Sequence, residues 1–268
     1  VYKRKWDVSE STFDLTENFE VEHDNPVLKS VDGVLYTKNG KMLLKCPSLK
    51  ASDIVVPEGT EVIRYDAFRG SHIKSIKMPD SLKKIEHTAF HFCQNLEKID
   101  FGNGITEIGR GIEWGEGYIF SECKNLKKVV IPEQVSSVGY GAFEGSGLTE
   151  VQLPKSITRI GACVFQNCKN LKQIFIPNAD VTIGGGALTS IKEVVIAECK
   201  YLPVNLDAGI TSLKSIFFTN LVKIKQGNDV VYFQRSIDWD DYGGLPKRKT
   251  LKDLKEFYLT LELPHPTE

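Results

Sequence analysis

No stretch of the sequence approaches the roughly 20 consecutive apolar residues that a membrane-spanning helix needs. A strong excess of basic charge is also missing, because 34 lysines and arginines are balanced by 35 acidic residues and the formal net charge is −1. Proteins that bind nucleic acid usually carry a strongly basic face, so this balance argues against that class. We therefore predict neither a membrane span nor a nucleic-acid partner for this chain.

Complete catalytic motifs are absent as well. The triple glycine at 184–186 is not followed by the Lys-Ser/Thr of a phosphate-binding loop, and 144–148 (EGSGL) lacks the G-x-S-x-G order of a nucleophile elbow. No nucleophile, base and orienting group come together in the sequence as catalysis would require. We predict that the protein is not an enzyme and uses no cofactor.

Two fragments contain metal-binding side chains without a complete ligand set. His87, His91 and Cys93 have a spacing that a zinc site on a helix could use, but a fourth ligand is not evident, and the alternative is a pair of histidines on a turn. The acidic segment 238–244 (DWDDYGG) lacks the spacing and the closing glutamate of an EF-hand loop. We predict no metal site and interpret 238–244 as a solvated acidic loop.

What the sequence does contain is an internal repeat. Six anchor residues recur at intervals of 22, 23, 30, 22 and 23 residues, and a β-branched residue follows each anchor six positions later. A phenylalanine or leucine comes eleven positions after each anchor, once seven extra residues within 110–117 are set aside. The anchors are Pro57, Pro79, Gly102, Pro132, Pro154 and Pro177. A fixed period of this length predicts a solenoid, in which stacked units share one continuous core.

Each repeat also contains a strand unit with the pattern apolar-x-x-apolar-x-apolar. These units begin at residues 73, 96, 126, 148, 171, 191, 213 and 254. The alternation in the last four residues predicts one short β-strand per repeat. In such a strand the fifth residue of the unit faces away from the core, and the third residue lies beside it.

The repeat resembles the bacterial leucine-rich repeat of the BspA-like type, with the pattern L-x-x-I-x-I-P-x-x-V-x-x-I-G-x-x-A-F-x-x-C-x-N. Residues 126–143 and 153–177 fit this pattern almost residue for residue, and 21–47 resembles the short β-hairpin unit that often accompanies such repeats. The resemblance implies a curved, right-handed, β-rich leucine-rich repeat solenoid with one short strand per 22–23-residue repeat and irregular turns on its convex side. It also implies a surface or secreted protein that binds other macromolecules, and no common catalytic activity.

The resemblance covers roughly residues 21–218 and suggests three parts. We expect an N-terminal cap and β-hairpin unit at 1–50, leucine-rich repeats at 51–218, and a diverged repeat or capping region at 219–268. The sequence begins at Val1 without methionine, so we expect a trimmed precursor whose signal segment has been removed. Both points predict a location at the cell surface or outside the cell.

Cysteine and glycine each recur at one position of the repeat. Cys93, Cys123 and Cys168 lie three residues after the repeat phenylalanine, where we expect a small buried side chain and free thiols. Cys93 and Cys123 are on consecutive turns, so a bridge between these two stays open as an alternative. Glycine follows the β-branched column directly in four copies, where we expect a bend to require it: Gly109, Gly139, Gly161 and Gly184.

The fifth residue of the strand unit provides the candidate binding surface. In the later repeats this column is largely apolar and aromatic, and on neighbouring strands such residues would merge into one exposed stripe. The candidates are Val130, Phe175, Val195, Phe217 and Tyr258. The alternatives are that 219–250 folds over the stripe or that another copy of the protein covers it, through this face or through the C-terminal end.

Two further features bear on the partner. The seven-residue insertion places Trp114 on a glycine-flanked loop, where it could stack on a sugar or anchor a protein contact, or else fold back over the convex side. The second residue of the strand unit is lysine in six of eight copies. This ladder suits an acidic polysaccharide, or it keeps the strand edges of neighbouring molecules apart.

These features together predict a non-enzymatic binding protein that recognises a protein or a polysaccharide through its inward-curving strand face. The alternative is a structural spacer or capping region of a larger surface protein, with no ligand of its own. The position of 219–250 distinguishes the two, because a stripe covered by this segment would be part of the core.

Overall fold

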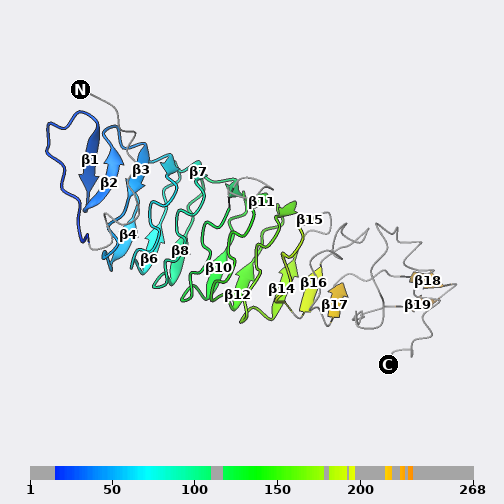
Figure 1. Cartoon of the computed structure of the whole chain (residues 1–268). Coiled ribbons are helices and arrows are strands. Elements are labelled where there is room, and N and C mark those ends of the chain that lie inside the picture. The colour runs from blue at the N-terminus through cyan, green and yellow to red at the C-terminus, as the bar shows by residue number, and fades with distance from the viewer. Residues whose placement is uncertain are drawn as a thin grey trace.

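The computed structural model describes residues 16–109, 117–177 and 181–191, together with the backbone of strands at 193–196, 215–218, 224–226 and 229–231. Within these ranges the chain is a solenoid of short β-strands, bends and turns that contains no helix (Figure 1). The leucine-rich repeat solenoid expected from the sequence is confirmed.

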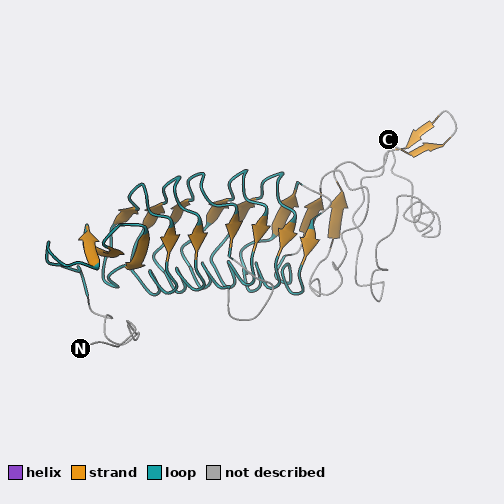
Figure 2. Cartoon of the chain, turned by 90° about the horizontal axis from the view of Figure 1, so that it is seen from above, coloured by secondary structure: helices purple, strands orange, loops and turns teal. Residues whose placement is uncertain are grey.

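The strands form two rows along the solenoid (Figure 2). The first row begins with β4 (Asp53–Val55), one turn before the first strand unit identified in the sequence, at the place of the third to fifth residues of such a unit. The other strands of this row coincide with the strand units and are β6 (Ser75–Lys77), β8 (Lys98–Asp100), β10 (Lys128–Val130), β12 (Glu150–Gln152), β14 (Gln173–Ile176), β16 (Glu193–Ile196) and β17 (Ser215–Phe218). The second row coincides with the β-branched column and contains β3 (Met42–Lys45), β5 (Val62–Ile63), β7 (Lys84–Ile85), β9 (Glu107–Ile108), β11 (Ser137–Val138), β13 (Arg159–Ile160) and β15 (Thr182–Ile183). The second row is an addition to the single strand per repeat that the sequence predicts.

Neighbouring strands within a row pair in parallel at equivalent positions of the repeat. Val129 of β10 pairs with Val151 of β12, and Val138 of β11 pairs with Ile160 of β13. Among the described strands this ladder is interrupted between β7 and β9 in the second row, and between β8 and β10 in the first. Both breaks border the turn that contains the insertion, so the first row consists of an N-terminal block from β4 to β8 and a C-terminal block from β10 to β17.

A β-hairpin extends the second row at its N-terminal end. Strands β1 (Leu28–Val31) and β2 (Val34–Thr37) pair antiparallel around Asp32 and Gly33, whose φ angles are 48° and 74°. Two consecutive positive φ angles are what a tight type I′ hairpin turn requires, and Asp-Gly is a preferred pair for it. Strand β2 pairs with β3, and β3 pairs with β5, so the hairpin continues the second row alone. A second hairpin, β18 (Ile224–Gln226) with β19 (Asp229–Val231), comes after the repeats.

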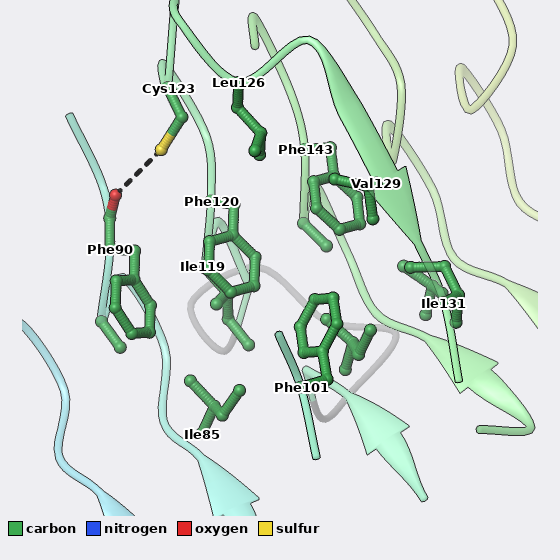
Figure 3. Packing of buried hydrophobic residues seen from close by; sticks show 14 of the residues in the cluster. Ile85, Phe90, Phe101, Ile119, Phe120, Cys123, Leu126, Val129, Ile131 and Phe143 are labelled. Carbon is green, nitrogen blue, oxygen red and sulfur yellow. Dashed lines mark hydrogen bonds between the residues drawn. The ribbon is translucent and has the colours of Figure 1, made fainter. Parts of the chain in front are cut away.

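The core is organised around a ladder of stacked phenylalanine rings, one from each turn. Ring centroids are 4.6 Å apart for Phe68 and Phe90, 4.8 Å for Phe90 and Phe120, and 5.5 Å for Phe120 and Phe143. Phe165 continues the ladder 6.0 Å beyond Phe143. All five side chains are fully buried, and Figure 3 shows the middle of the ladder. The phenylalanine column of the sequence is therefore the centre of the core.

The cysteine column lies beside this ladder and ties each turn to the preceding one. The thiols of Cys93, Cys123 and Cys168 donate to the carbonyl oxygens of Phe68, Phe90 and Phe143, at 2.9, 3.2 and 3.1 Å; Figure 3 shows the Cys123 bond. The three cysteines are buried and free. The expectation of small, buried, unpaired side chains is confirmed, and the alternative bridge between Cys93 and Cys123 is not formed.

The buried thiols make stability depend on pH. Burial raises the pKa of Cys168 from 9.0 to about 11, and that of Cys46 from 9.0 to about 12. The folded state thus keeps these protons at pH values where the unfolded chain has lost them, so the contribution of the two thiols to the free energy of unfolding should be constant below pH 9.0 and fall from there to about pH 12. For Cys168 alone the loss should be about 2–3 kcal/mol. Urea unfolding across this range measures it, and a Cys168→Ala variant whose profile is as steep as that of the unmodified chain would contradict the assignment.

Each turn bends at two positions of positive φ on the way from the second row to the first. The position two residues before the ladder ring is Asp66, Thr88, Tyr118, Gly141 or Cys163, with φ between 53° and 60°. The position two residues after it is Gly70, Phe92, Glu122, Gly145 or Asn167, with φ between 59° and 67°. Most of these residues are not glycine, so the packing of the turns imposes a backbone conformation that their side chains disfavour.

Candidate functional site

The outer side of the first row, which we call the strand face, is formed by the third and fifth residues of the strand units. In β10 the side chains of Lys128 and Val130 are exposed, whereas Val129 between them is buried. At all six described positions of the fifth-residue column, from Val55 to Phe175, the side chain is exposed. This alternation is the direct result of the two-residue period of a β-strand.

Within each of the two blocks, parallel pairing lines up the fifth residues across the strand face. From the N-terminal end the row reads Val55, Lys77, Asp100, Val130, Gln152, Phe175, Val195 and Phe217. Val130 is 50% exposed and Phe175 is 46% exposed. For Val195 and Phe217 the backbone register is described, and it places them at the two positions that follow Phe175. Trp114, Tyr258 and the acidic segment 238–244 lie outside the described residues.

The two blocks of the first row differ in character. In the N-terminal block the fifth residues are Val55, Lys77 and Asp100, so charged side chains dominate. In the C-terminal block, Gln152 is the one polar residue of the row among the five registered positions from β10 to β17. The change from mixed to apolar composition therefore coincides with the break between β8 and β10.

A chain of polar contacts borders the apolar part of the strand face. Lys128 forms an ion pair with Glu150 at 2.7 Å, and the Gln152 amide donates to the same carboxylate at 2.8 Å. The hydrogen bond from Lys128 is the main reason why the pKa of Glu150 lies below its ordinary value. Glu150 therefore stays ionised and holds Gln152, which lies between Val130 and Phe175 in the row, while Lys128 lies beside them on β10. An apolar patch with a polar rim is the usual composition of a protein interaction site.

A second group of aromatic residues, of which Tyr65 and Phe92 are exposed and Tyr140 is buried, lies on the bends and was not anticipated from the sequence. The Tyr65 and His87 rings are parallel with centroids 5.2 Å apart, and the Arg64 guanidinium lies 4.3 Å from the Tyr65 centroid. On the following turns Phe92 contacts His91, and Tyr118 contacts Tyr140. The signal was available in the sequence, because these residues lie within three positions of the ladder phenylalanine, but the repeat pattern leaves those positions unspecified.

Two sets of polar side chains near these bends contain residue types that are common in catalytic or metal sites, but their reactive atoms are buried. The Nδ1 atom of His91 contacts the hydroxyl of Ser121, but Ser121 is only 1% exposed, so a substrate cannot reach it. The sulfur of Cys93, which the sequence grouped with His87 and His91, is buried against the Phe68 carbonyl. Within the described ranges there is no group of three His, Cys, Asp or Glu side chains arranged to hold a metal ion. The same ranges contain no helix that is long and apolar enough to cross a membrane.

Solved structures of bacterial leucine-rich repeat proteins resemble this chain. A leucine-rich repeat protein from Eubacterium ventriosum matches at 21% identity and a TM-score of 0.52, over 66% of this chain and 53% of that one. A leucine rich cell surface protein from Faecalibacterium prausnitzii matches at 25% identity and a TM-score of 0.45, over 74% and 41% of the two chains. The pneumococcal vaccine antigen PcpA matches at 25% identity and a TM-score of 0.44, over 67% and 39%. The first of these likenesses supports the solenoid fold.

The chain spans only about two fifths to one half of the length of these three proteins, with 39%, 41% and 53% of them covered. No curated protein matches it. The model of the BspA type leucine rich repeat region, in contrast, matches six copies over residues 43–112 and 116–225, which is more than half of the chain. The protein therefore belongs to the BspA-type leucine-rich repeat family.

Proposed function

We propose that this chain is a non-enzymatic binding protein of the cell surface or the extracellular space, and that it recognises a protein or a polysaccharide through the C-terminal block of the strand face. The observation that carries the proposal is the row of Phe175, Val195 and Phe217 on three neighbouring strands, with Val130 on the far side of Gln152; Phe175 and Val130 are about half exposed. The family supports it further, since leucine-rich repeat proteins are typically binding or scaffold proteins.

The composition of the face favours a protein ligand. Phe175 and Val130 offer apolar area that gains free energy when water is removed from it, and the ion pair of Lys128 with Glu150 can remain at the rim. A polysaccharide with acidic groups would instead be drawn to the lysines at the entry of each strand, of which Lys74, Lys127 and Lys172 are exposed. The salt dependence of binding distinguishes a protein ligand from an acidic polysaccharide, because binding that depends on exposed charges weakens at high ionic strength.

A panel of immobilised matrix proteins and glycans, probed with the purified chain, tests the proposal. We expect at least one saturable interaction, which a Phe175→Ser substitution should weaken about tenfold, because a central aromatic side chain commonly contributes about 1–2 kcal/mol or more to an interface. Phe92→Ser is the matched control, since Phe92 is 41% exposed but lies on a bend away from the strand face. Its binding should stay within about twofold of the unmodified chain.

Two results would count against the proposal. If the panel contains no ligand for a correctly folded chain, the role of structural spacer within a larger surface protein is favoured instead. If Phe175→Ser and Phe92→Ser weaken binding equally, the ligand lies on another surface.

A further inference from the structure

The two rows of strands end differently at the N-terminal side of the solenoid. The second row is extended beyond β3 by the hairpin of β2 and β1. The first row begins at β4, which among the described strands pairs with β6 and with no other (Figure 1). The solenoid is thus capped by a hairpin on one side only, and β4 is an edge strand.

The backbone groups on the outer edge of β4 can be identified from the hydrogen bonds on its inner edge. The amide of Val56 donates to the Lys77 carbonyl at 2.9 Å, so the main-chain amide and carbonyl of Val56 point toward β6. The main-chain groups of successive residues point to opposite edges of a strand, so those of Val55 point away from β6. Lys77, one turn further on, uses its carbonyl for the preceding strand in this same bond. The corresponding carbonyl of Val55 and the main chain of Asp53 therefore point to the place where a preceding strand would lie. Within the described ranges no backbone hydrogen bond engages the amide or carbonyl of either residue.

The exposed fractions of the β4 side chains indicate that the outer edge of this strand is open although the core beneath it is covered. Val55 is 67% exposed, more than Phe175 in the same column, which is 46% exposed and has a paired strand on each side. Ile54 between Asp53 and Val55 is nevertheless only 5% exposed. The end of the core is therefore already covered, and what β4 leaves open is a row of main-chain donors and acceptors together with two outward side chains.

We propose that the edge of β4 is a second interaction site, which takes up an extended segment of a partner protein as an added parallel strand. Unpaired main-chain groups in this arrangement are complementary to an extended backbone, and strand addition of this kind is a common mode of peptide recognition. The side chains set the preference. The Asp53 carboxylate, one oxygen of which accepts a hydrogen bond from Ser75 at 2.7 Å, favours a basic residue opposite, and Val55 favours an apolar residue two positions later. The short length and the charge of β4 keep the edge from pairing indiscriminately.

This site is separate from the C-terminal block of the strand face and does not depend on the proposed function. The chain itself supplies a suitable probe, because residues 126–133 (LKKVVIPE) carry Lys128 and Val130 at the positions that would lie opposite Asp53 and Val55. A fluorescent peptide of this sequence should bind the full chain saturably. A peptide in which glutamate replaces the residue corresponding to Lys128 should bind about fivefold more weakly, because like charges would then face each other.

Variants of Val55 separate backbone pairing from side-chain contact. Val55→Pro removes an outward-facing amide that the fold does not use, and proline is tolerated at such edge positions. It should weaken peptide binding about fivefold or more, whereas Val55→Thr, which keeps the amide, should stay within about twofold. Hydrogen exchange of the Val55 amide should be fast in the chain alone and slower with the peptide. Asp53→Lys, which leaves the backbone intact, should reverse the preference between the two peptides.

The proposal is overturned if neither peptide binds saturably, or if Val55→Pro binds as well as Val55→Thr. It is also overturned if the Val55 amide is already protected in the chain alone, since another part of the chain then fills the edge. Concentration-dependent association of the chain, abolished by Val55→Pro and measured by sedimentation, would assign the edge to a second copy and not to a partner peptide.

Discussion

Replacing Phe120 with alanine is expected to lower the free energy of unfolding by about 3–5 kcal/mol, the usual range for removing a fully buried phenylalanine. Phe120 lies at the middle of the ring ladder, 4.8 Å from the Phe90 ring and 5.5 Å from that of Phe143. It also meets Phe101 edge to face, at 5.7 Å. Its loss leaves a cavity that three surrounding rings cannot fill without moving. Urea unfolding followed by circular dichroism measures the effect.

The same substitution should also reduce cooperativity, because each turn of a solenoid is stabilised mainly by its two neighbours. A gap at Phe120 weakens the junction between the N-terminal and C-terminal turns, so we expect a lower m-value in addition to the lower midpoint. Phe175→Ala is the control, since that ring is exposed and its removal should change stability by no more than about 0.5 kcal/mol. Similar losses for the two variants would contradict the assignment of Phe120 to the core.

Replacing Gly161 with valine is expected to destabilise the fold by about 3 kcal/mol or more, which is the upper end of the usual cost of overpacking. A Cβ atom on Gly161 would lie 2.9 Å from the carbonyl carbon of Gly139 and 2.9 Å from the amide nitrogen of Tyr140. Both are backbone atoms of the preceding turn, so no side-chain rotation relieves the clash. Thermal unfolding of the Gly161→Val variant measures the loss.

Gly70→Ala separates this steric effect from the conformational freedom of glycine. Gly70 has a φ of 67°, but a Cβ atom there would meet nothing within 4 Å. Its replacement should cost only about 1 kcal/mol, the penalty for placing alanine in the left-handed region. A Gly161→Val variant no less stable than Gly70→Ala would show that adjacent turns are not in close contact at this column.

The glycine column illustrates how a sequence pattern can be recognised correctly for an incorrect reason. The sequence suggested that a bend requires glycine after the β-branched residue. Gly109 does have a positive φ, but Gly139, Gly161 and Gly184 do not. At these three positions a Cβ atom would come within 2.4–2.9 Å of backbone atoms of the preceding turn. Glycine is therefore needed for the close approach of stacked turns, which depends on contacts between repeats and cannot be seen within one of them.

The repeat frame predicted the buried part of the fold well because each core position recurs in every turn. The phenylalanine column, the cysteine column and the fifth residues of the strands were all assigned by position alone, and the described residues bear out the burial of the first two. The second row of strands was missed because two-residue strands such as β11 leave no alternation to detect. Their pairing is a consequence of stacking, which places equivalent β-branched residues such as Val138 and Ile160 side by side.

The surface could be predicted only in part, because selection for packing does not fix exposed residues. The positions of Val130 and Phe175 follow from strand alternation, and the structure places both in one exposed row. The aromatic residues on the bends were missed because the repeat pattern leaves their positions unspecified, and Tyr118 and Phe92 adopt positive φ angles there that their residue types give no reason to expect. The open edge of β4 depends on where the hairpin pairs, which the sequence pattern alone does not determine.

Hydroxyl-radical footprinting of the free, full-length chain tests most directly whether the C-terminal block of the strand face is open for a ligand. Phe175 and Phe92 are 46% and 41% exposed, whereas Phe143 is fully buried, so these three rings provide a target and two references of the same chemistry. We predict that Phe175 is oxidised at a rate comparable to that of Phe92. Protection of Phe175 to the level of Phe143 would show that the face is covered by the rest of the chain or by another copy, and would contradict a binding role for it.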